Sequence, residues 1–167
     1  MTGPESTGKT TLARELAEWL NTEWVPEAAR RMAERVARPL AAADVEPIAR
    51  EHIALADAAA ARALASGVRS LVLDTDLLST LIYARHYYGR VARWIEDAER
   101  RRRADLYLLC DVDVPWRPDG VRDRPVDRTT MFAEFERALS RRRASVVVVR
   151  GTWSDRSRIA LAAVAGV

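Results

Sequence analysis

The eight residues from 3 to 10, Gly-Pro-Glu-Ser-Thr-Gly-Lys-Thr, have the types and spacing of a phosphate-binding loop. Glycines at both ends of the loop let the backbone curl, so that several amides can point at phosphate oxygens. Lys9 supplies positive charge for the terminal phosphates, and the Thr10 hydroxyl is a ligand for Mg²⁺. We therefore predict ATP and Mg²⁺ as ligands, with Lys9 also catalytic. The predicted contacts to ATP come from Gly3, Glu5, Ser6, Thr7, Gly8, Lys9, Thr10 and Thr11.

Lys9 is the only lysine among the 27 basic residues of the chain. The Asn-Lys-x-Asp motif that reads guanine is therefore impossible, which excludes a GTPase of that type. Asp74 is followed by Thr75 rather than by the glutamate expected in many hydrolytic ATPases. The pattern favours a phosphotransferase, which closes over two substrates.

Asp74 ends the hydrophobic run 70–73, where a P-loop protein presents its second acidic group. It is predicted to hold Mg²⁺ or to take the proton from an attacking hydroxyl. The alternative is an N-cap for the next helix, a role that Thr75 or Asp76 could fill instead. Asp76 is also a candidate for substrate contact.

Glu27, Arg30 and Trp116 are further candidates for contact with the phosphate acceptor. Glu27 and Arg30 follow a short strand, on the side where open α/β sheets bind ligands. Their alternative is an exposed ion pair at i,i+3 spacing. Trp116 lies in a polar loop, where it could stack on a substrate ring or anchor the loop.

Arg122, Arg124 and Arg128 lie in the polar loop 113–128. Arginines in such a loop can close over ATP and neutralise charge in the transition state. We assign Arg122 and Arg128 to catalysis and Arg124 to ATP. In a chain this rich in arginine, each could equally be a solvated surface group.

Short hydrophobic runs alternate with longer helical patterns along the whole chain. This alternation predicts one α/β domain over residues 1–167, a three-layer P-loop fold whose mainly parallel sheet is flanked by helices. The strands are expected at 23–25, 70–74, 106–110 and 146–149, and the helices at 9–20, 27–38, 45–66, 77–88, 90–103, 131–141 and 154–163. Trp19 is expected on the core face of the first helix, and Asp44 is expected as an N-cap.

A P-loop normally follows a central strand, yet only Met1 and Thr2 precede Gly3. An empty central position would leave backbone groups of its neighbours unpaired. We therefore expect the first central strand to be truncated.

Charge and composition limit the classes of partner that the chain is expected to bind and the compartment in which it is expected. The net charge of +3 comes without a nucleic-acid recognition motif, and no apolar run reaches 18 residues, so neither nucleic acid nor membrane is expected. A single cysteine, Cys110, favours a reducing compartment, hence the cytoplasm. The sequence does not predict an oligomeric state.

Four blocks of sequence resemble the nicotinamide riboside kinase domain of NadR-like NAD-salvage proteins. They are residues 3–12, 25–30, 74–78, and 111–116 with 119–122, in that order along nearly the whole chain. The resemblance implies transfer of the ATP γ-phosphate to the 5′-hydroxyl of nicotinamide riboside. It also implies that Trp116 stacks on the pyridinium ring, that Asp119 and Glu27 offset its charge or hold ribose hydroxyls, and that 151–155 lie near adenine.

Two features depart from that family. Ala28 stands where an aromatic residue is common, and the adenylyltransferase domain that often accompanies the kinase is absent from this sequence. The competing interpretations are a kinase for another nucleoside or sugar, and an ATP-sensing module without transferase activity.

Overall fold

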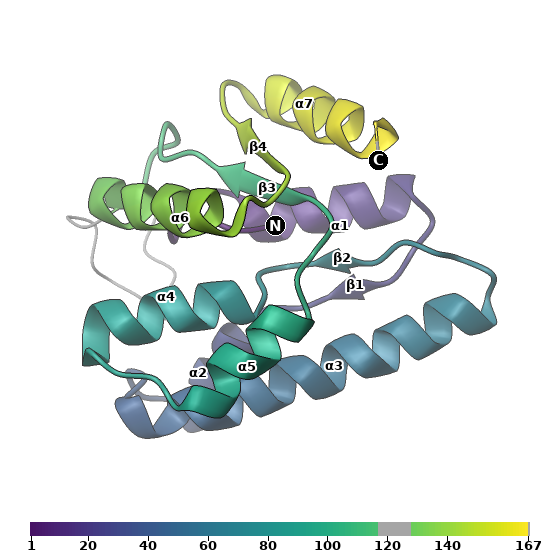
Figure 1. Ribbon diagram of the computed structural model, residues 1–167. Helices are drawn as coiled ribbons and strands as arrows, with labels where there is room; N and C mark the ends of the chain where they lie inside the picture. Colours follow the sequence, from purple (N-terminus) through teal and green to yellow (C-terminus); the bar gives the residue numbers. More distant parts are fainter. Residues whose placement is uncertain (117–127, 167) are drawn as a thin grey trace.

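The computed structural model describes residues 1–116 and 128–166 as helices packed on a parallel sheet (Figure 1). Strand β1 (Trp24–Val25) pairs in parallel with β2 (Val72–Leu73). Strand β3 (Tyr107–Cys110) pairs in parallel with β4 (Val146–Val149). The predicted α/β class with a parallel sheet is confirmed.

Met1 and Thr2 join the two strand pairs at the centre of the sheet. Four backbone hydrogen bonds hold them: Met1 N to Leu73 O at 2.7 Å, Thr75 N to Met1 O at 3.1 Å, Thr2 N to Leu108 O at 2.9 Å and Cys110 N to Thr2 O at 2.9 Å. The order across the sheet is therefore β1, β2, residues 1–2, β3, β4. The central position is short, as predicted, and its neighbours' backbone groups are paired there.

Helices cover both faces of the sheet, which gives the three predicted layers (Figure 1). Helices α1 (Lys9–Trp19) and α7 (Trp153–Ala165) pack on one face. Helices α4 (Leu77–Tyr88) and α6 (Arg128–Arg142) pack on the other. The remaining helices are α2 (Ala28–Val36), the 3₁₀ turn η1 (Ala42–Asp44), α3 (Val45–Ala65) and α5 (Arg93–Arg101). No helix within residues 1–116 and 128–166 is long and apolar enough to cross a membrane.

Strand β3 shows how the sheet supports both helical layers. Side chains alternate between the two faces of a strand. Leu108 and Cys110 enter the core beneath α1 and α7, whereas Tyr107 and Leu109 enter the core beneath α4 and α6. All four are buried, so β3 is a central strand that fixes both layers against the P-loop.

One local prediction was wrong, and another was right in position but not in its hydrogen bond. Trp19 is 57% exposed, because α1 ends there and Leu20 packs against the core instead. Asp44 stands at the start of α3, but its side chain makes no capping bond to that helix. It accepts instead from the Ala41 amide at 2.8 Å and pairs with Arg38, because η1 runs straight into α3 and turns the carboxylate back.

Candidate active site

The P-loop is a tight turn between the centre of the sheet and α1. Gly3, Ser6 and Gly8 have φ values of 126°, 52° and 80°, in the left-handed region. A Cβ atom on Gly3 would lie 2.7 Å from the Cys110 carbonyl oxygen, so any side chain would collide with β3. The close approach therefore explains the first glycine of the motif.

Lys9 lies inside the loop rather than in solvent. Its side chain is buried, and Nζ donates a hydrogen bond to the Pro4 carbonyl oxygen. The Thr7 hydroxyl donates to the same oxygen at 2.8 Å. The first turn of α1 contains no acidic residue, so the positive end of the helix dipole and Lys9 act together. This arrangement is suited to an anion such as a phosphate.

Asp74 directly follows β2 and lies close to the P-loop. It is 1% exposed, and neither carboxylate oxygen makes a hydrogen bond of ordinary geometry to the described residues. Burial is the main cause that raises the pKa of Asp74, and the charge of Glu27 adds to it. The Thr10 hydroxyl and Lys9 act in the opposite direction on this pKa.

The oxygens of Asp74 and Thr10 fit a hard cation such as Mg²⁺. Mg²⁺ prefers oxygen ligands and is usually held by one or two protein groups, with waters and substrate phosphates completing its shell. Within the described ranges, no group of three histidine, cysteine or acidic side chains gathers as a metal site. A cation here would therefore depend on the nucleotide for its other ligands.

A cavity of about 800 Å³ opens between α2, α3 and α4. Its polar wall contains Glu27, Glu34, Arg38, His52, Thr75, Ser79, Thr80, Tyr83, Tyr87 and Tyr88. Glu27 lies in this wall and also acts electrostatically on Asp74, so the cavity adjoins the P-loop side of the site. The volume and the aromatic wall are suited to a small molecule with a ring.

The other predicted acceptor residues differ in their surroundings. Arg30 forms the i,i+3 ion pair with Glu27 at 3.9 Å that was the alternative interpretation. Asp76 is the N-cap of α4, where it accepts from the Ser79 amide at 3.2 Å and the Tyr107 hydroxyl at 3.1 Å. Burial raises the pKa of Asp76. Trp116 is partly buried and is not among the described residues that line the cavity.

Arg128 reaches the P-loop from the start of α6. It is 9% exposed, and Nη2 donates to the carbonyl oxygens of Ser6 at 3.4 Å, Val112 at 3.4 Å and Val114 at 3.1 Å. A buried guanidinium therefore lies at the loop, as the prediction for Arg128 requires. Asp119, Arg122 and Arg124 lie outside the residues that the structure describes.

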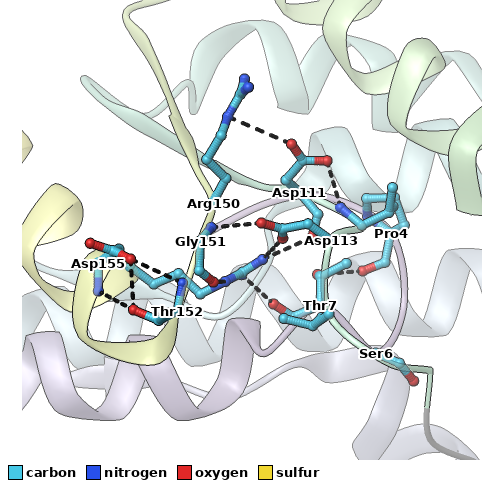
Figure 2. Close-up of polar contacts among 12 residues, drawn as sticks. Pro4, Ser6, Thr7, Asp111, Asp113, Arg150, Gly151, Thr152 and Asp155 are labelled. Carbon is cyan, nitrogen blue, oxygen red and sulfur yellow. Dashed lines mark hydrogen bonds and ion pairs between the residues drawn. The ribbon is translucent and has the colours of Figure 1, made fainter.

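Sequence reasoning missed Arg156 and most of the cavity wall. Arg156 is fully buried and donates to the Thr7 carbonyl oxygen of the P-loop at 3.0 Å. Figure 2 shows the neighbouring Asp111, Asp113 and Gly151 converging on this side of the loop. Nothing in the sequence distinguishes this arginine from the others. The paired tyrosines 87 and 88 carried a usable signal, since two adjacent aromatic residues end a helix beside the site.

Comparison with known proteins agrees with this geometry. A family described as an AAA domain matches residues 1–156. The chain is 30% identical over 145 residues to the trifunctional NAD biosynthesis/regulator protein NadR of Escherichia coli (strain K12), a match that covers 82% of this chain and 33% of that protein. The chain thus spans about a third of the length of this curated relative.

Two solved structures of NadR protein are similar to almost the whole chain. One is in complex with NR and has a TM-score of 0.82 and 25% identity, over 99% of this chain and 49% of that chain. The other is in complex with NAD and AMP-PNP and has a TM-score of 0.82 and 24% identity, over 99% of this chain and 47% of that chain. At this lower identity, the second likeness shows the fold alone. The P-loop geometry and the family match over residues 1–156 lead to one conclusion: the chain belongs to the AAA-domain family of P-loop proteins.

Proposed function

We propose that the protein is a kinase that transfers the γ-phosphate of ATP to the 5′-hydroxyl of nicotinamide riboside (NR) and forms nicotinamide mononucleotide. The observation that carries this proposal is the junction of two sites at Asp74. Lys9 and Thr10 of the P-loop act on this carboxylate, and so does Glu27 of the cavity wall. The likeness to NadR protein in complex with NR supports the choice of acceptor.

The P-loop is the proposed ATP site. Backbone amides between Gly3 and Gly8 cradle the phosphates, and the buried Lys9 leaves its Pro4 partner to bind the terminal phosphates. Thr10 and Asp74 would hold Mg²⁺, which would neutralise charge that develops on the phosphates.

Asp74 has a second proposed role as the group that accepts the proton of the attacking hydroxyl. Its raised pKa brings the carboxylate closer to the range in which a general base is effective. Arg128, together with Arg122 and Arg124, offsets negative charge as the phosphoryl group moves. The remaining step is in-line attack by an acceptor held in the adjoining cavity.

The cavity is suited to a cationic aromatic acceptor. Tyr83, Tyr87 and Tyr88 line it, and the buried Glu27 adds negative charge, while the lining Arg38 is paired with Asp44. Rings of this kind attract a cation placed over their face, and the pyridinium of NR carries such a charge. We also assign Arg30, Asp76, Trp116 and Asp119 to the acceptor side, as contacts or as supports of contacts.

The test is product formation by the purified chain. With ATP, Mg²⁺ and NR, mass spectrometry is expected to detect nicotinamide mononucleotide and one ADP for each product molecule. A panel of neutral nucleosides and sugars serves as the control for acceptor identity. Phosphorylation of one of these in preference to NR would replace the acceptor, and ATP binding without turnover on any acceptor would contradict a kinase.

A further inference from the structure

Arg156 of α7 joins three segments that are distant in sequence. Its side chain is the largest of those that are fully buried in the described residues. Its guanidinium donates to the carbonyl oxygens of Thr7 at 3.0 Å, Gly151 at 3.2 Å and Asp111 at 3.2 Å, and to the Asp113 carboxylate. The P-loop, the end of β3 and the loop before α7 therefore meet at one cation.

We propose that Arg156 is a positioning residue that sets the orientation of the P-loop peptide between Thr7 and Gly8. The peptide bond is trans, so its C=O and N–H point in opposite directions. Arg156 holds the Thr7 carbonyl toward α7, and this turns the Gly8 amide to the opposite side of the chain. The inference rests on the proposed nucleotide site and adds the residue that orders its phosphate cradle.

The contact geometry requires an arginine. A guanidinium has five N–H donors in a rigid plane, and four acceptors surround this one. A lysine has three donors on one atom and cannot reach acceptors on both edges of that plane. A buried cation also needs a nearby negative charge, which Asp113 provides.

Asp113 binds both Arg156 and the loop before α7, one with each carboxylate oxygen. Oδ2 accepts from the Gly151 amide at 2.6 Å, while Oδ1 accepts from Arg156. An asparagine here would keep one acceptor and replace the other with a donor, which cannot accept from an amide. Asp113 therefore supports the phosphate cradle through Arg156.

The experiment compares Arg156→Lys and Asp113→Asn with the wild-type chain. The matched control is Arg158→Met, since Arg158 lies on the same helix with a side chain that is 72% exposed. Affinities for ATP and for inorganic tripolyphosphate are measured by calorimetry, and folding is checked by circular dichroism. Tripolyphosphate has no base or sugar, so it reports on the phosphate cradle alone.

Both variants are expected to bind ATP and tripolyphosphate about tenfold more weakly, a loss of about 1.4 kcal/mol, while the control stays within about twofold. Asp113 is partly exposed, so Asp113→Asn decides the matter if the lysine variant does not fold. A folded Asp113→Asn variant with unchanged tripolyphosphate affinity would overturn the inference. If the chain does not phosphorylate NR but the variants still lose tripolyphosphate affinity, the acceptor assignment fails and the role of Arg156 stands.

Discussion

Asp74 is the residue at which stability and proposed function oppose each other. The carboxylate is buried, and burial raises its pKa, as does the charge of Glu27. The folded protein therefore binds this proton more tightly than the unfolded chain does. The resulting stabilisation is present below the ordinary pKa of aspartate and is lost as pH rises through the raised pKa. At neutral pH the ionised form costs stability.

We expect Asp74→Asn to abolish phosphoryl transfer and to stabilise the protein. The amide removes the buried charge, and a gain of about 1 kcal/mol is typical of such changes at strained sites. For a chain of this size, that gain corresponds to about 3 °C in Tm. Thermal unfolding at pH 7 without ligands measures it. A variant that is less stable than wild type would contradict our account of the buried charge.

Glu27→Gln is expected to move the acid limb of the pH profile to lower pH. Removing the charge of Glu27 removes one cause that raises the pKa of Asp74, so Asp74 stays ionised in more acidic solution. The profile of kcat/KM measures this, since it reports groups of the free enzyme. Glu34→Gln is the matched control, because Glu34 also lines the cavity but is exposed. Equal shifts in both variants would argue against a specific effect of Glu27.

At the scale of elements, hydrophobic patterns predicted what local sequence can determine. The strand Val146–Val149 has the predicted bounds, and the helix starts at Lys9 and Leu77 are also as predicted. The errors came at residues whose burial or hydrogen bonding depends on contacts that the local pattern does not contain. Trp19 has the spacing of a core residue, but it is 57% exposed at the last residue of α1, whereas the adjacent Leu20 packs against the core. The hydrophobic pattern along one helix cannot show where the neighbouring elements stop packing against it.

Helices α5 and α6 are joined by a buried ion pair, which allows a test of packing. Glu99 is 2% exposed and binds Arg142 through both oxygens, at 2.8 Å and 3.2 Å. Removing one partner of a buried pair leaves the other uncompensated. We therefore expect Glu99→Ala to lower the free energy of unfolding by about 3 kcal/mol.

The control for this pair is Asp57→Ala. Asp57 binds Arg102 with similar geometry, but their side chains are 56% and 40% exposed. An exposed pair contributes about 0–1 kcal/mol. Urea denaturation of both variants measures the difference, and an equal loss in the two would show that burial does not set the strength of the Glu99 pair.

At the scale of the whole molecule, the proposed ATP site was predictable from the sequence. The proposed site of the phosphate acceptor was only partly predictable. Eight consecutive residues make the P-loop, so its motif can be recognised directly in the sequence. The cavity is assembled from α2, α3 and α4, and among its described lining residues the sequence predicted only Glu27 as an acceptor contact. Arg128 and Arg156 both contact the P-loop, yet one was predicted and the other missed. The burial of Arg156 depends on how α7 packs, which the sequence does not display.

The central claim is that one molecule brings ATP on the P-loop and NR in the cavity together at Asp74. The direct measurement is acceptor-dependent ADP release by the wild-type chain and by Asp74→Asn, with nicotinamide mononucleotide quantified in the same samples. We predict that NR stimulates ADP release with one product per ADP in the wild type, and that Asp74→Asn keeps its fold and ATP binding but forms no product. ADP release that is independent of NR, or an Asp74→Asn variant with wild-type product formation, would contradict the claim.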